Sequence, residues 1–384
     1  MKTVTILGST GSIGCSTVDL IKGHCDKFKV RALTAHKNVA LLARQAQELQ
    51  AEYAVIADKD LYGNLKEALK NTTVKVEAGH PAVVTAAGLP AQWVMAAIVG
   101  AAGVEATFRA IQQGTTVALA NKEALVCAGA LMIDAAQKYG TTLLPVDSEH
   151  NAIFQVLNPA RMDQVKRIIL TASGGPFLRK TRQELADVTP EQAVRHPTWS
   201  MGAKISIDSA TMMNKSLEII EASYLFKLKS EKIDVLIHPQ SIVHSMVEYI
   251  DGSVLSQMGA PDMRTPIAHA LAWPERIATT GSTLNLSNNL HLSFEPIDLT
   301  RFPSVQMARQ VLQAEGGAPA VFNASNEVAV AAFLTRKLKF FHIENVVEKV
   351  LQNMKINSPS NLHDVFSLDQ EARRQAEGVV AGMG

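Results

Sequence analysis

The hydrophobic pattern of the first 146 residues alternates between two kinds of segment. Short apolar runs, typical of buried strands, lie between segments whose apolar residues recur every three or four positions, as on one face of a helix. Alternating strands and helices predict a parallel sheet that is covered by helices. The predicted strands span residues 3–7, 28–35, 53–57, 94–100, 115–120 and 141–146, and the clearest helices span residues 39–49 and 123–139.

The pattern changes after residue 146. Residues 147–275 mix helical segments with apolar runs, which predicts a central α+β domain. Residues 276–302 are polar and weakly periodic, so we expect a linker there. Residues 303–384 carry four helical patterns, which predicts a small four-helix bundle. The apolar runs expected as strands of the central domain are residues 165–172, 233–238 and 242–250.

Composition narrows the class of protein. A chain of 384 residues is long enough for two or three domains. Its 37 Lys and Arg nearly balance its 36 Asp and Glu, so no charge excess points to nucleic acid or to a membrane surface. The three cysteines show no paired or metal-like spacing, which suits a reducing compartment. No signal peptide is visible, and the longest apolar run is shorter than the roughly 20 residues that a membrane span needs, so we expect a cytoplasmic protein.

A glycine-rich turn follows the first predicted strand and precedes a helical pattern. Its sequence is 8-GSTGSIG-14, with glycines three residues apart. Glycines allow a tight turn and close approach of the backbone to a pyrophosphate, which the N-terminus of the helix attracts. The hydroxyl groups of Ser9, Thr10 and Ser12 offer further donors. An ordinary βα turn is the alternative, but the position favours a dinucleotide site and a Rossmann-like domain at residues 1–146.

The end of the second predicted strand bears on the choice of cofactor. An enzyme that uses NAD usually places an acidic residue there, to bind the ribose 2′-hydroxyl. This chain has His36, Lys37 and Asn38 instead. A cationic loop suits a 2′-phosphate, so the sequence favours NADP over NAD, with a solvated surface lysine as the alternative.

Polar residues also follow the strand at residues 115–120, which ends in Asn121, Lys122 and Glu123. Ligands of open parallel sheets bind at the carboxyl ends of the strands. We therefore expect Lys122 to face a nicotinamide and an anionic substrate. The alternative is a lysine that merely begins a helix, where a cation is slightly unfavourable.

The next strand ends in 147-DSEH-150. If this segment is extended, Asp147 and Glu149 point to the same side. Two neighbouring carboxylates repel each other unless a cation or a proton joins them, and oxygen ligands favour Mg²⁺ or Mn²⁺. A helix cap formed by Asp147 or Ser148 explains the same residues. This stretch alone leaves both interpretations open.

A third carboxylate lies in a predicted helix within residues 206–226. Asn214 and Glu218 are four positions apart on one face, with Lys215 beside them. Ser, Asn and Lys near the start of a helix suit a phosphate, and Glu218 is the candidate third metal ligand. The alternative is an ordinary solvated polar face.

Two loops complete the candidate site. Ser173 follows a predicted strand and precedes two glycines, whose backbone N–H groups suit an anion. The loop 195-RHPTWSMG-202 holds an aromatic and an apolar residue where loops are mostly polar, as in lids that exclude water. The alternative is an aromatic residue that anchors the loop to the core. His244 lies on a predicted strand, where a histidine is more often structural.

Together these motifs resemble the 1-deoxy-D-xylulose 5-phosphate reductoisomerase family. The matches appear in the family's order and extend from residue 4 past residue 330. The motifs are 8-GSTGSIG-14, 121-NKE-123, 147-DSEHNAIFQ-155, 172-ASGGPF-177, 196-HPTWSMG-202, 209-SATMMNKSLE-218, 238-HPQSIVHSMV-247, 261-PDMRTPIAHALAWP-274 and 323-NASNE-327.

The resemblance implies a homodimeric enzyme of the non-mevalonate isoprenoid pathway that uses NADPH and Mg²⁺ or Mn²⁺. It would convert 1-deoxy-D-xylulose 5-phosphate into 2-C-methyl-D-erythritol 4-phosphate, by retro-aldol cleavage and re-addition or by a direct alkyl shift, and then reduction. Residues 147–275 would hold the metal and substrate site and the dimer interface. A simple NADP-dependent dehydrogenase of another small phosphorylated substrate would need no three-carboxylate site, and an NADP-sensing binding protein leaves the acidic residues unexplained.

The same resemblance implies roles for individual residues. The metal ligands would be Asp147, Glu149 and Glu218, with Lys122, His150 and His244 as further catalytic residues. The substrate would contact Ser148, Ser173, His196, Trp199, Met201, Ser209, Asn214 and Lys215. The cofactor would contact Gly8, Thr10, Gly11, Ser12, Ile13, His36, Lys37, Asn38, Asn121, Lys122, Glu123, Gly202 and Met263. The chain departs from the family at His36, often Gly there, and at Thr198, commonly Asn there, which leaves two polar contacts open.

Overall fold

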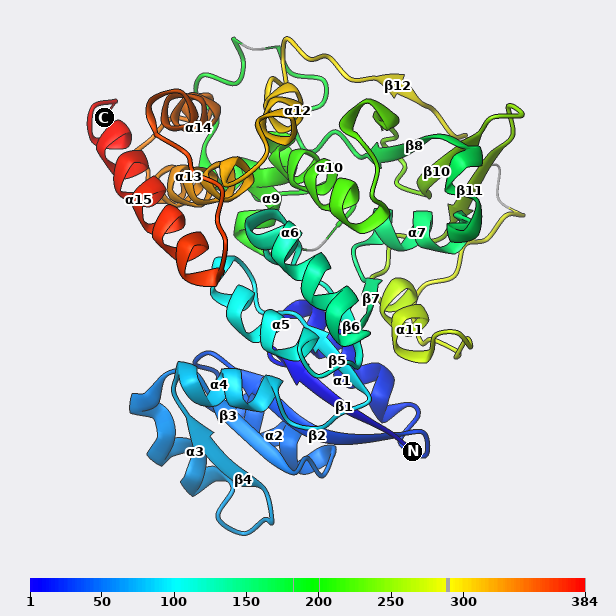
Figure 1. Cartoon of the computed structure of the whole chain (residues 1–384), viewed down its shortest axis with the longest axis vertical. Helices are drawn as coiled ribbons and strands as arrows, with labels where there is room; N and C mark the ends of the chain where they lie inside the picture. The colour runs from blue at the N-terminus through cyan, green and yellow to red at the C-terminus, as the bar shows by residue number, and fades with distance from the viewer. Residues whose placement is uncertain (182, 200, 288–290, 384) are drawn as a thin grey trace. The chain divides into compact units, whose positions relative to one another are not determined.

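The computed structural model describes residues 1–181, 183–199, 201–287 and 291–383 (Figure 1). Parts of three predicted segments lie outside these ranges: residues 288–290 of the linker, Ser200 of the lid motif and Gly384 of the helical bundle. The chain divides into two compact units, each built from several segments. Unit 1 comprises Met1–Ala124, Met132–Asn151 and Asp262–Gly281, and unit 2 comprises Leu125–Leu131, Ala152–Pro261 and Ser282–Gly384.

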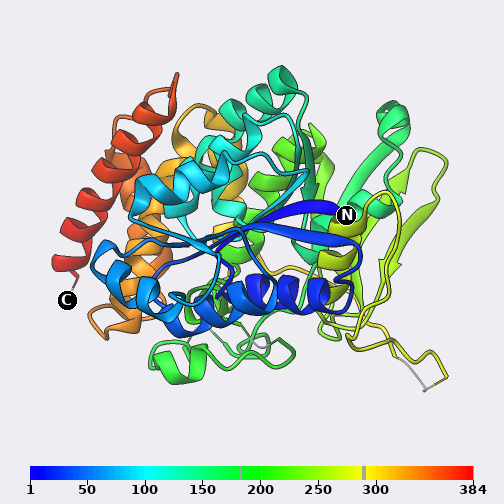
Figure 2. The same cartoon turned by 90° about the horizontal axis from the view of Figure 1, so that it is seen from below.

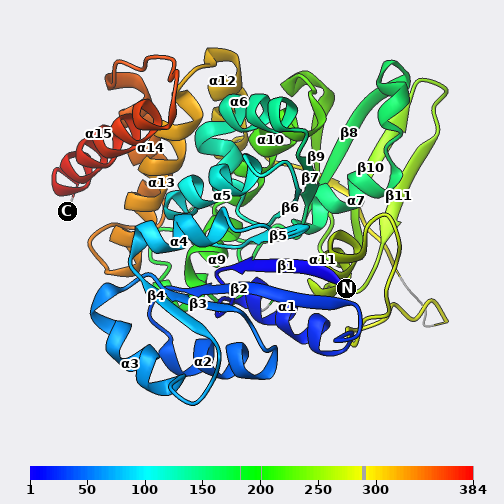
Figure 3. The ribbon, with the colours of Figure 1, turned by 60° about the horizontal axis from the view of Figure 1, so that its bottom comes forward.

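Unit 1 contains a sheet in which seven strands of the described chain pair in parallel, in the order β4-β3-β2-β1-β5-β6-β7. Helices α1, α2 and α3 lie on one face and α4 and α5 on the other (Figures 2 and 3). The strands are β1 (Lys2–Leu7), β2 (Phe28–Ala35), β3 (Tyr53–Ile56), β4 (Lys75–Ala78), β5 (Trp93–Ala96), β6 (Thr116–Leu119) and β7 (Thr142–Pro145). The helices are α1 (Ser12–Lys22), α2 (Val39–Glu48), α3 (Tyr62–Ala68), α4 (His80–Ala87), α5 (Val104–Ile111), α6 (Lys122–Tyr139) and α7 (Ser148–Val156), of which the last two run on into unit 2.

Helix α11 (Arg264–Ala272) belongs to unit 1, although it follows strands of unit 2 in the sequence. The indole N–H of Trp93 donates to the carbonyl of Ala270 at 2.9 Å, and Lys2 Nζ donates to the carbonyl of Leu271 at 3.0 Å. These bonds occupy carbonyl groups near the end of the helix, where intrahelical donors run out. Met263, which precedes α11, therefore belongs to the same unit as the glycine turn.

Unit 2 contains a mixed sheet, in which five strands within the described ranges follow the order β11-β10-β8-β9-β12. Strands β8 and β9 are parallel, and the remaining pairs are antiparallel. Helix α10 packs on this sheet through an apolar face that includes Leu217 and Ile220. The strands are β8 (Val165–Ala172), β9 (Ile233–Ile237), β10 (Val243–Tyr249), β11 (Val254–Met258) and β12 (Glu295–Pro296), and the helices before the C-terminal region are α8 (Pro190–Ala193), α9 (Ala203–Ala210) and α10 (Met213–Phe226).

The C-terminal region is helical, as predicted. Within residues 303–383 the structure has four helices, drawn from yellow-orange to red in Figure 1. Helix α13 contacts α9, α12, α14 and α15, and most of its residues are buried. The four helices are α12 (Ser304–Ala314), α13 (Ala318–Leu334), α14 (His342–Asn353) and α15 (Leu362–Ala381).

The α/β class with a parallel N-terminal sheet and a helical C-terminal region is confirmed. The proposed domain boundaries remain a prediction. Three edge strands, β4, β11 and β12, were not predicted, because none of them contains a fully buried residue. Strand β12 lies within the expected linker. In the described part of the chain, no helix is long and apolar enough to cross a membrane.

Candidate active site

The turn between β1 and α1 depends on glycine at two positions. Gly8 has a φ of +84°, and a Cβ atom there would lie 2.6 Å from the carbonyl oxygen of Ala97. A Cβ atom at Gly14 would lie 2.2 Å from the carbonyl oxygen of Gly8, well inside any normal contact. At Gly11 the nearest atom would be 3.5 Å away, an ordinary contact. Packing therefore requires Gly8 and Gly14, whereas Gly11 leaves the outer side of the turn open.

Helix α1 begins at this turn with its N–H groups accessible. Its N-cap is Gly11, and within the described residues no side chain caps the helix. Gly11 and Ser12 are exposed, while Thr10 and Ile13 are partly buried. Ser9, whose hydroxyl we expected as a further donor, is fully buried instead. The N-terminus of α1 thus offers backbone donors and a positive dipole end to an anion, as a pyrophosphate site requires.

The loop after β2 carries the residues expected near a 2′-phosphate. His36, Lys37 and Asn38 are all exposed. Lys37 Nζ lies 3.9 Å from an oxygen of Asp58, at the limit of an ion pair. The side chain of Asn38 accepts a hydrogen bond of 3.1 Å from the N–H of Leu41, so it also caps α2. Lys37 is therefore an exposed cation in this loop, while Asn38 is engaged in capping α2.

The carboxyl ends of β6 and β7 bring Lys122 and Asp147 together. The two strands are adjacent and parallel, with Leu119 opposite Pro145, so the residues that follow them meet at one edge of the sheet. Lys122 is 6% exposed, and its Nζ lies 2.6 Å from Asp147 Oδ2. Lys122 thus begins α6 and also forms a buried ion pair, so its role in the site stays a prediction. Asn121 caps α6 by accepting a bond of 3.2 Å from the N–H of Ala124, and Glu123 follows in the first turn.

The segment after β7 is helical, so the extended geometry that we considered is wrong. Helix α7 starts at Ser148, and the N–H of Asn151 donates to the carbonyl of Asp147 at 2.8 Å. Asp147 thus occupies the position of a helix cap. Its carboxylate still lies beside two other possible ligands, because the ligand atoms of Glu149 and of His150 are within 4.8 Å of it. Capping and clustering, weighed as alternatives in the sequence, therefore occur together.

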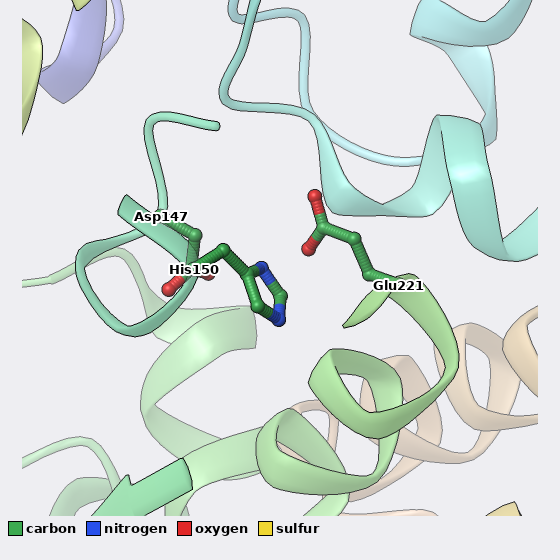
Figure 4. A group of neighbouring side chains, drawn as sticks. All are labelled: Asp147, His150 and Glu221. Atoms are coloured by element: carbon green, nitrogen blue, oxygen red, sulfur yellow. The ribbon is translucent and has the colours of Figure 1, made fainter. Parts of the chain in front are cut away.

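Neighbouring groups keep the carboxyl group of Asp147 ionised. Burial raises the pKa of this carboxyl group, but the positive charge of Lys122 and the imidazole of His150 lower the pKa by more. The net pKa lies well below the usual range, so Asp147 is ionised at neutral pH. The hydroxyl of Ser148 donates to Glu149 Oε2 at 2.5 Å, which orients the second carboxylate. Figure 4 labels the side chains of Asp147 and His150, at the start of α7, and of Glu221 on α10.

Helix α10 carries a buried polar face, so the alternative of a solvated face is wrong. Lys215 is 3% exposed, and Glu218 and Glu221 have no exposed surface. Lys215 Nζ and Asn214 Nδ2 both donate to the carboxylate of Glu218. Sequence reasoning missed Glu221, although its spacing of three residues from Glu218 places both acids on the same side of a helix.

The Ser173 turn at the end of β8 holds a neutral imidazole. His196 Nε2 and Ser173 Oγ are 2.9 Å apart, while the N–H groups of Thr198 and Trp199 donate to His196 Nδ1 at 3.1 and 3.0 Å. Because Nδ1 accepts, Nε2 carries the proton and donates to Ser173. Burial lowers the pKa of His196 to about 4, which keeps the ring neutral at physiological pH.

The predicted lid packs near His244. The rings of Trp199 and His244 have centroids 6.2 Å apart, and His244 is buried on β10. Met201 is partly buried, and Gly202 is the exposed N-cap of α9. Ser209 lies near the end of α9, just before α10 and its Asn214. The Ser173 turn, the segment around Trp199 and the starts of α9 and α10 therefore all belong to unit 2.

Comparisons with known proteins agree with these motifs. Models of 1-deoxy-D-xylulose 5-phosphate reductoisomerase match residues 4–129, and models of its C-terminal domains match residues 143–226 and 258–375. The reductoisomerase of Zymomonas mobilis is 56% identical over 382 residues, covering 100% of this chain and 98% of its own. That of Rhodospirillum centenum is also 56% identical, covering 100% of this chain and 96% of its own. The chain belongs to the 1-deoxy-D-xylulose 5-phosphate reductoisomerase family.

Solved structures of this family superimpose over nearly the whole chain. The reductoisomerase from Zymomonas mobilis in complex with NADPH has a TM-score of 0.94 and 55% identity, covering 99% of both chains. A reductoisomerase in complex with NADPH, fosmidomycin and magnesium has a TM-score of 0.96 and 40% identity, covering 99% of this chain and 98% of its own. The fold expected from the motifs is thus the fold of the family.

Proposed function

We propose that the residues described above carry out the reaction of the family in this chain. The reaction rearranges 1-deoxy-D-xylulose 5-phosphate and reduces the product with NADPH to 2-C-methyl-D-erythritol 4-phosphate, in the non-mevalonate isoprenoid pathway. The observation that carries the assignment to residues is the buried pair of Lys122 and Asp147, at the edge of the sheet where cofactor and substrate are expected. An ionised carboxylate beside a second carboxylate at that position is the arrangement that a divalent cation requires.

The turn before α1 fits the cofactor. A related structure is described as a complex with NADPH. In this chain Gly8 and Gly14 bring the backbone into a tight turn, and α1 begins there with N–H groups that no side chain caps among the described residues. We assign the cofactor phosphates to the turn around Gly11 and the 2′-phosphate to Lys37 and its neighbours. The remaining proposed contacts are Gly8, Thr10, Ser12, Ile13, His36, Asn38, Asn121, Lys122, Glu123, Gly202 and Met263.

The acidic residues fit a hard divalent cation. A related structure is described as a complex with magnesium. We assign Asp147, Glu149 and Glu218 as the ligands, because carboxylate oxygens suit Mg²⁺ or Mn²⁺ and Lys122 keeps Asp147 ionised. Lys122, which pairs with Asp147, would provide a positive charge beside the metal ligands.

The metal ion and the cofactor supply different parts of the reaction. When bound, they supply a Lewis acid for the substrate carbonyl and a hydride for the aldehyde that follows. The chain itself binds and orients the substrate: Ser148 lies beside the carboxylates, and Lys122 provides a positive charge. His150 and His244 are proposed as further catalytic residues, both buried next to proposed ligand or lid residues.

The substrate phosphate is assigned to unit 2. Ser173 Oγ accepts a hydrogen bond from the N–H at His196 Nε2. The hydroxyl hydrogen of Ser173 is therefore able to donate to a phosphate oxygen. The proposed phosphate subsite consists of Ser173, His196, Ser209, Asn214 and Lys215. Binding energy from this non-reacting group is used to close the segment of Trp199 and Met201 over the substrate.

A homodimer and a cytoplasmic location complete the proposal. Strand β11 lies at the edge of its sheet and exposes Val254, Leu255 and Met258, which supports pairing with a second copy of the chain. The three cysteines form no disulfide within the described residues, which supports a reducing compartment. The domain division is proposed as before, with the cofactor domain at residues 1–146, the catalytic and connective domain at 147–275, a linker at 276–302 and the helical bundle at 303–384.

An assay of NADPH oxidation with 1-deoxy-D-xylulose 5-phosphate tests the proposal. We expect turnover with Mg²⁺ or Mn²⁺, none after treatment with EDTA, and recovery when the metal is restored. A matched reaction with NADH should be much slower. Turnover that survives EDTA would instead indicate a simple dehydrogenase, and the three-carboxylate assignment would be wrong.

A further inference from the structure

The motif 323-NASNE-327 has no role in the site described above, although it lies in the most buried helix of the C-terminal region. Asn326 of α13 has no exposed surface. Its Nδ2 donates to Asp208 Oδ1 of α9 at 2.8 Å, while its Oδ1 has no hydrogen-bond partner among the described residues. A buried amide with an unsatisfied oxygen is unfavourable, so the bond to Asp208 is the interaction that accounts for an asparagine here.

Asp208 is itself buried, and Lys204 also pairs with it. Its side chain is 1% exposed, and its second oxygen lies 2.9 Å from Lys204 Nζ, one turn earlier in α9. A buried carboxylate depends on such donors. The amide of Asn326 must present its nitrogen rather than its oxygen to this carboxylate, because two acceptors would repel each other. The contact therefore ties α9 to α13 in one orientation.

The end of α9 that Asn326 holds also packs against the Ser173 turn. A Cβ atom at Gly175 would lie 2.8 Å from the carbonyl oxygen of Ser209, so the two backbones are in direct contact. On another side, the hydroxyl of Ser304 donates to the carbonyl of Thr211 at 2.9 Å. The end of α9 is thus fixed by packing against the Ser173 turn and by hydrogen bonds from α12 and α13.

We propose that Asn326 is a positioning residue for the phosphate subsite, acting through Asp208 to set the position of Ser209 relative to Ser173. The proposal rests on the proposed function, which places both serines at the substrate phosphate. Asn326 touches neither the substrate nor a cofactor. Its effect is a matter of geometry: a small shift of α9 would move one of the two serines away from the other.

Substitution of Asn326 by Leu in the full chain tests this role, because Leu is of similar size and lacks the amide. The KM for 1-deoxy-D-xylulose 5-phosphate and the inhibition constant of inorganic phosphate should both rise about tenfold, the factor that corresponds to about 1.4 kcal/mol. The dissociation constant of NADPH should change by less than about threefold, because the cofactor phosphates are assigned to the turn before α1 and not to this subsite. If Asn326→Leu does not fold, Asn326→Ala, with a better helix former, should give the same split.

Two further variants separate positioning from stability. Ser325→Ala removes a neighbouring buried hydroxyl of α13, which donates to the carbonyl of Val321, and should leave KM unchanged. Asp208→Leu removes the acceptor of Asn326 and should raise KM as Asn326→Leu does. A lower melting temperature with unchanged KM in Asn326→Leu would overturn the proposal, as would equal losses of phosphate and NADPH affinity.

The variant Ser209→Ala distinguishes failure of this inference from failure of the proposed function. It should weaken inorganic phosphate as an inhibitor at least as much as Asn326→Leu does. If Ser209→Ala weakens phosphate and Asn326→Leu does not, the positioning role alone is wrong. If neither variant affects phosphate, the phosphate subsite lies elsewhere and both proposals are wrong.

Discussion

The turns before α1 and before α7 follow strands of the same parallel sheet but are built from opposite kinds of residue. The first contains three glycines and no charge, and helix α1 begins without a side-chain cap among the described residues. The second contains no glycine, and Asp147 both occupies the cap position and pairs with the buried Lys122. A pyrophosphate needs backbone N–H groups that side chains do not obstruct, whereas a cation needs side-chain oxygens that stay ionised. The first turn thus suits an anion because it has no charged or capping side chain among the described residues, and the second suits a cation because it has carboxylates in place of glycines.

Replacing the charge of the second turn should have the largest effect. Asn caps helices as well as Asp does, so Asp147→Asn keeps the start of α7 and removes the charge. We expect turnover to fall roughly a thousandfold, in line with the several kcal/mol that a metal supplies to a transition state. Steady-state rates over a range of Mg²⁺ concentrations, with circular dichroism for the fold, measure this.

The exposed residue Asp163 provides a matched control. Asp163→Asn makes the same chemical change outside the site and should leave kcat and KM unchanged. Near-normal rates in Asp147→Asn would mean that Asp147 only caps the helix, and the contrast between the two turns would lose its basis.

Adding a methyl group to the first turn should act through shape alone. In Gly14→Ala the new Cβ would meet backbone atoms at 2.2 and 2.5 Å, so the turn must shift. Overpacking that costs the NADPH complex about 1–3 kcal/mol corresponds to a loss of NADPH affinity of roughly 5- to 150-fold. Gly11→Ala, where the nearest atom is 3.5 Å away, should keep the stability of the fold. Fluorescence titration with NADPH and thermal unfolding of both variants test this, and equal destabilisation by the two would contradict the packing argument.

The proposed cofactor site has its positively charged side chain, Lys37, at the end of β2, and the glycine turn has none. Lys37→Ala should weaken NADPH about tenfold, or about 1.4 kcal/mol, and change NADH affinity little, because only NADPH carries the 2′-phosphate. Lys27→Ala is the matched control, since this exposed lysine precedes the same strand at its opposite end. Parallel titrations with the two cofactors decide the point, and an equal loss for both would remove Lys37 from the 2′-phosphate site.

The Ser173 turn contains two glycines, and the neutral imidazole of His196 donates a hydrogen bond to it. Replacing His196 should have the smallest effect of the changes considered, and that effect is on the pH dependence of stability. The pKa of His196 is about 4 in the folded chain and near 6.5 when unfolded. Between these values the unfolded chain binds more protons, so lowering the pH through this window destabilises the fold. Urea unfolding should show a weaker pH dependence between pH 6.5 and 4 for His196→Gln than for the wild type. Identical pH dependence would show that His196 is protonated in the folded state.

Parts of this account were predictable because the signals are local. Strands β2 and β8 have the predicted bounds, since each is an apolar run of buried residues. The positions of Lys122 and Asp147 at the carboxyl ends of strands were predicted, whereas their pairing depends on β6 and β7 being neighbours, which the sequence does not show. The glycine turn was visible from its spacing alone.

Other features depend on tertiary packing, which the pattern does not record. The polar face of α10 looks like a solvated surface in sequence, because burial of Lys215 and Glu218 depends on what covers the helix. The start of α7 at Ser148 is decided by the bond from Asn151 to Asp147, which a strand-like reading of the segment misses. The edge strand β4 is recognised only by its pairing with β3.

The central claim is that carboxylates of this chain hold a divalent cation which the reaction requires, and Glu218→Gln tests it most directly. The variant keeps the size of the side chain and one of its two acceptor oxygens, so it can still accept from Asn214 or from Lys215, and circular dichroism checks that the chain folds. The measurement is the rate of NADPH oxidation with 1-deoxy-D-xylulose 5-phosphate as Mg²⁺ is added back after EDTA. We predict full recovery in the wild type and no metal-dependent turnover in folded Glu218→Gln; wild-type-like recovery in the variant would contradict the account.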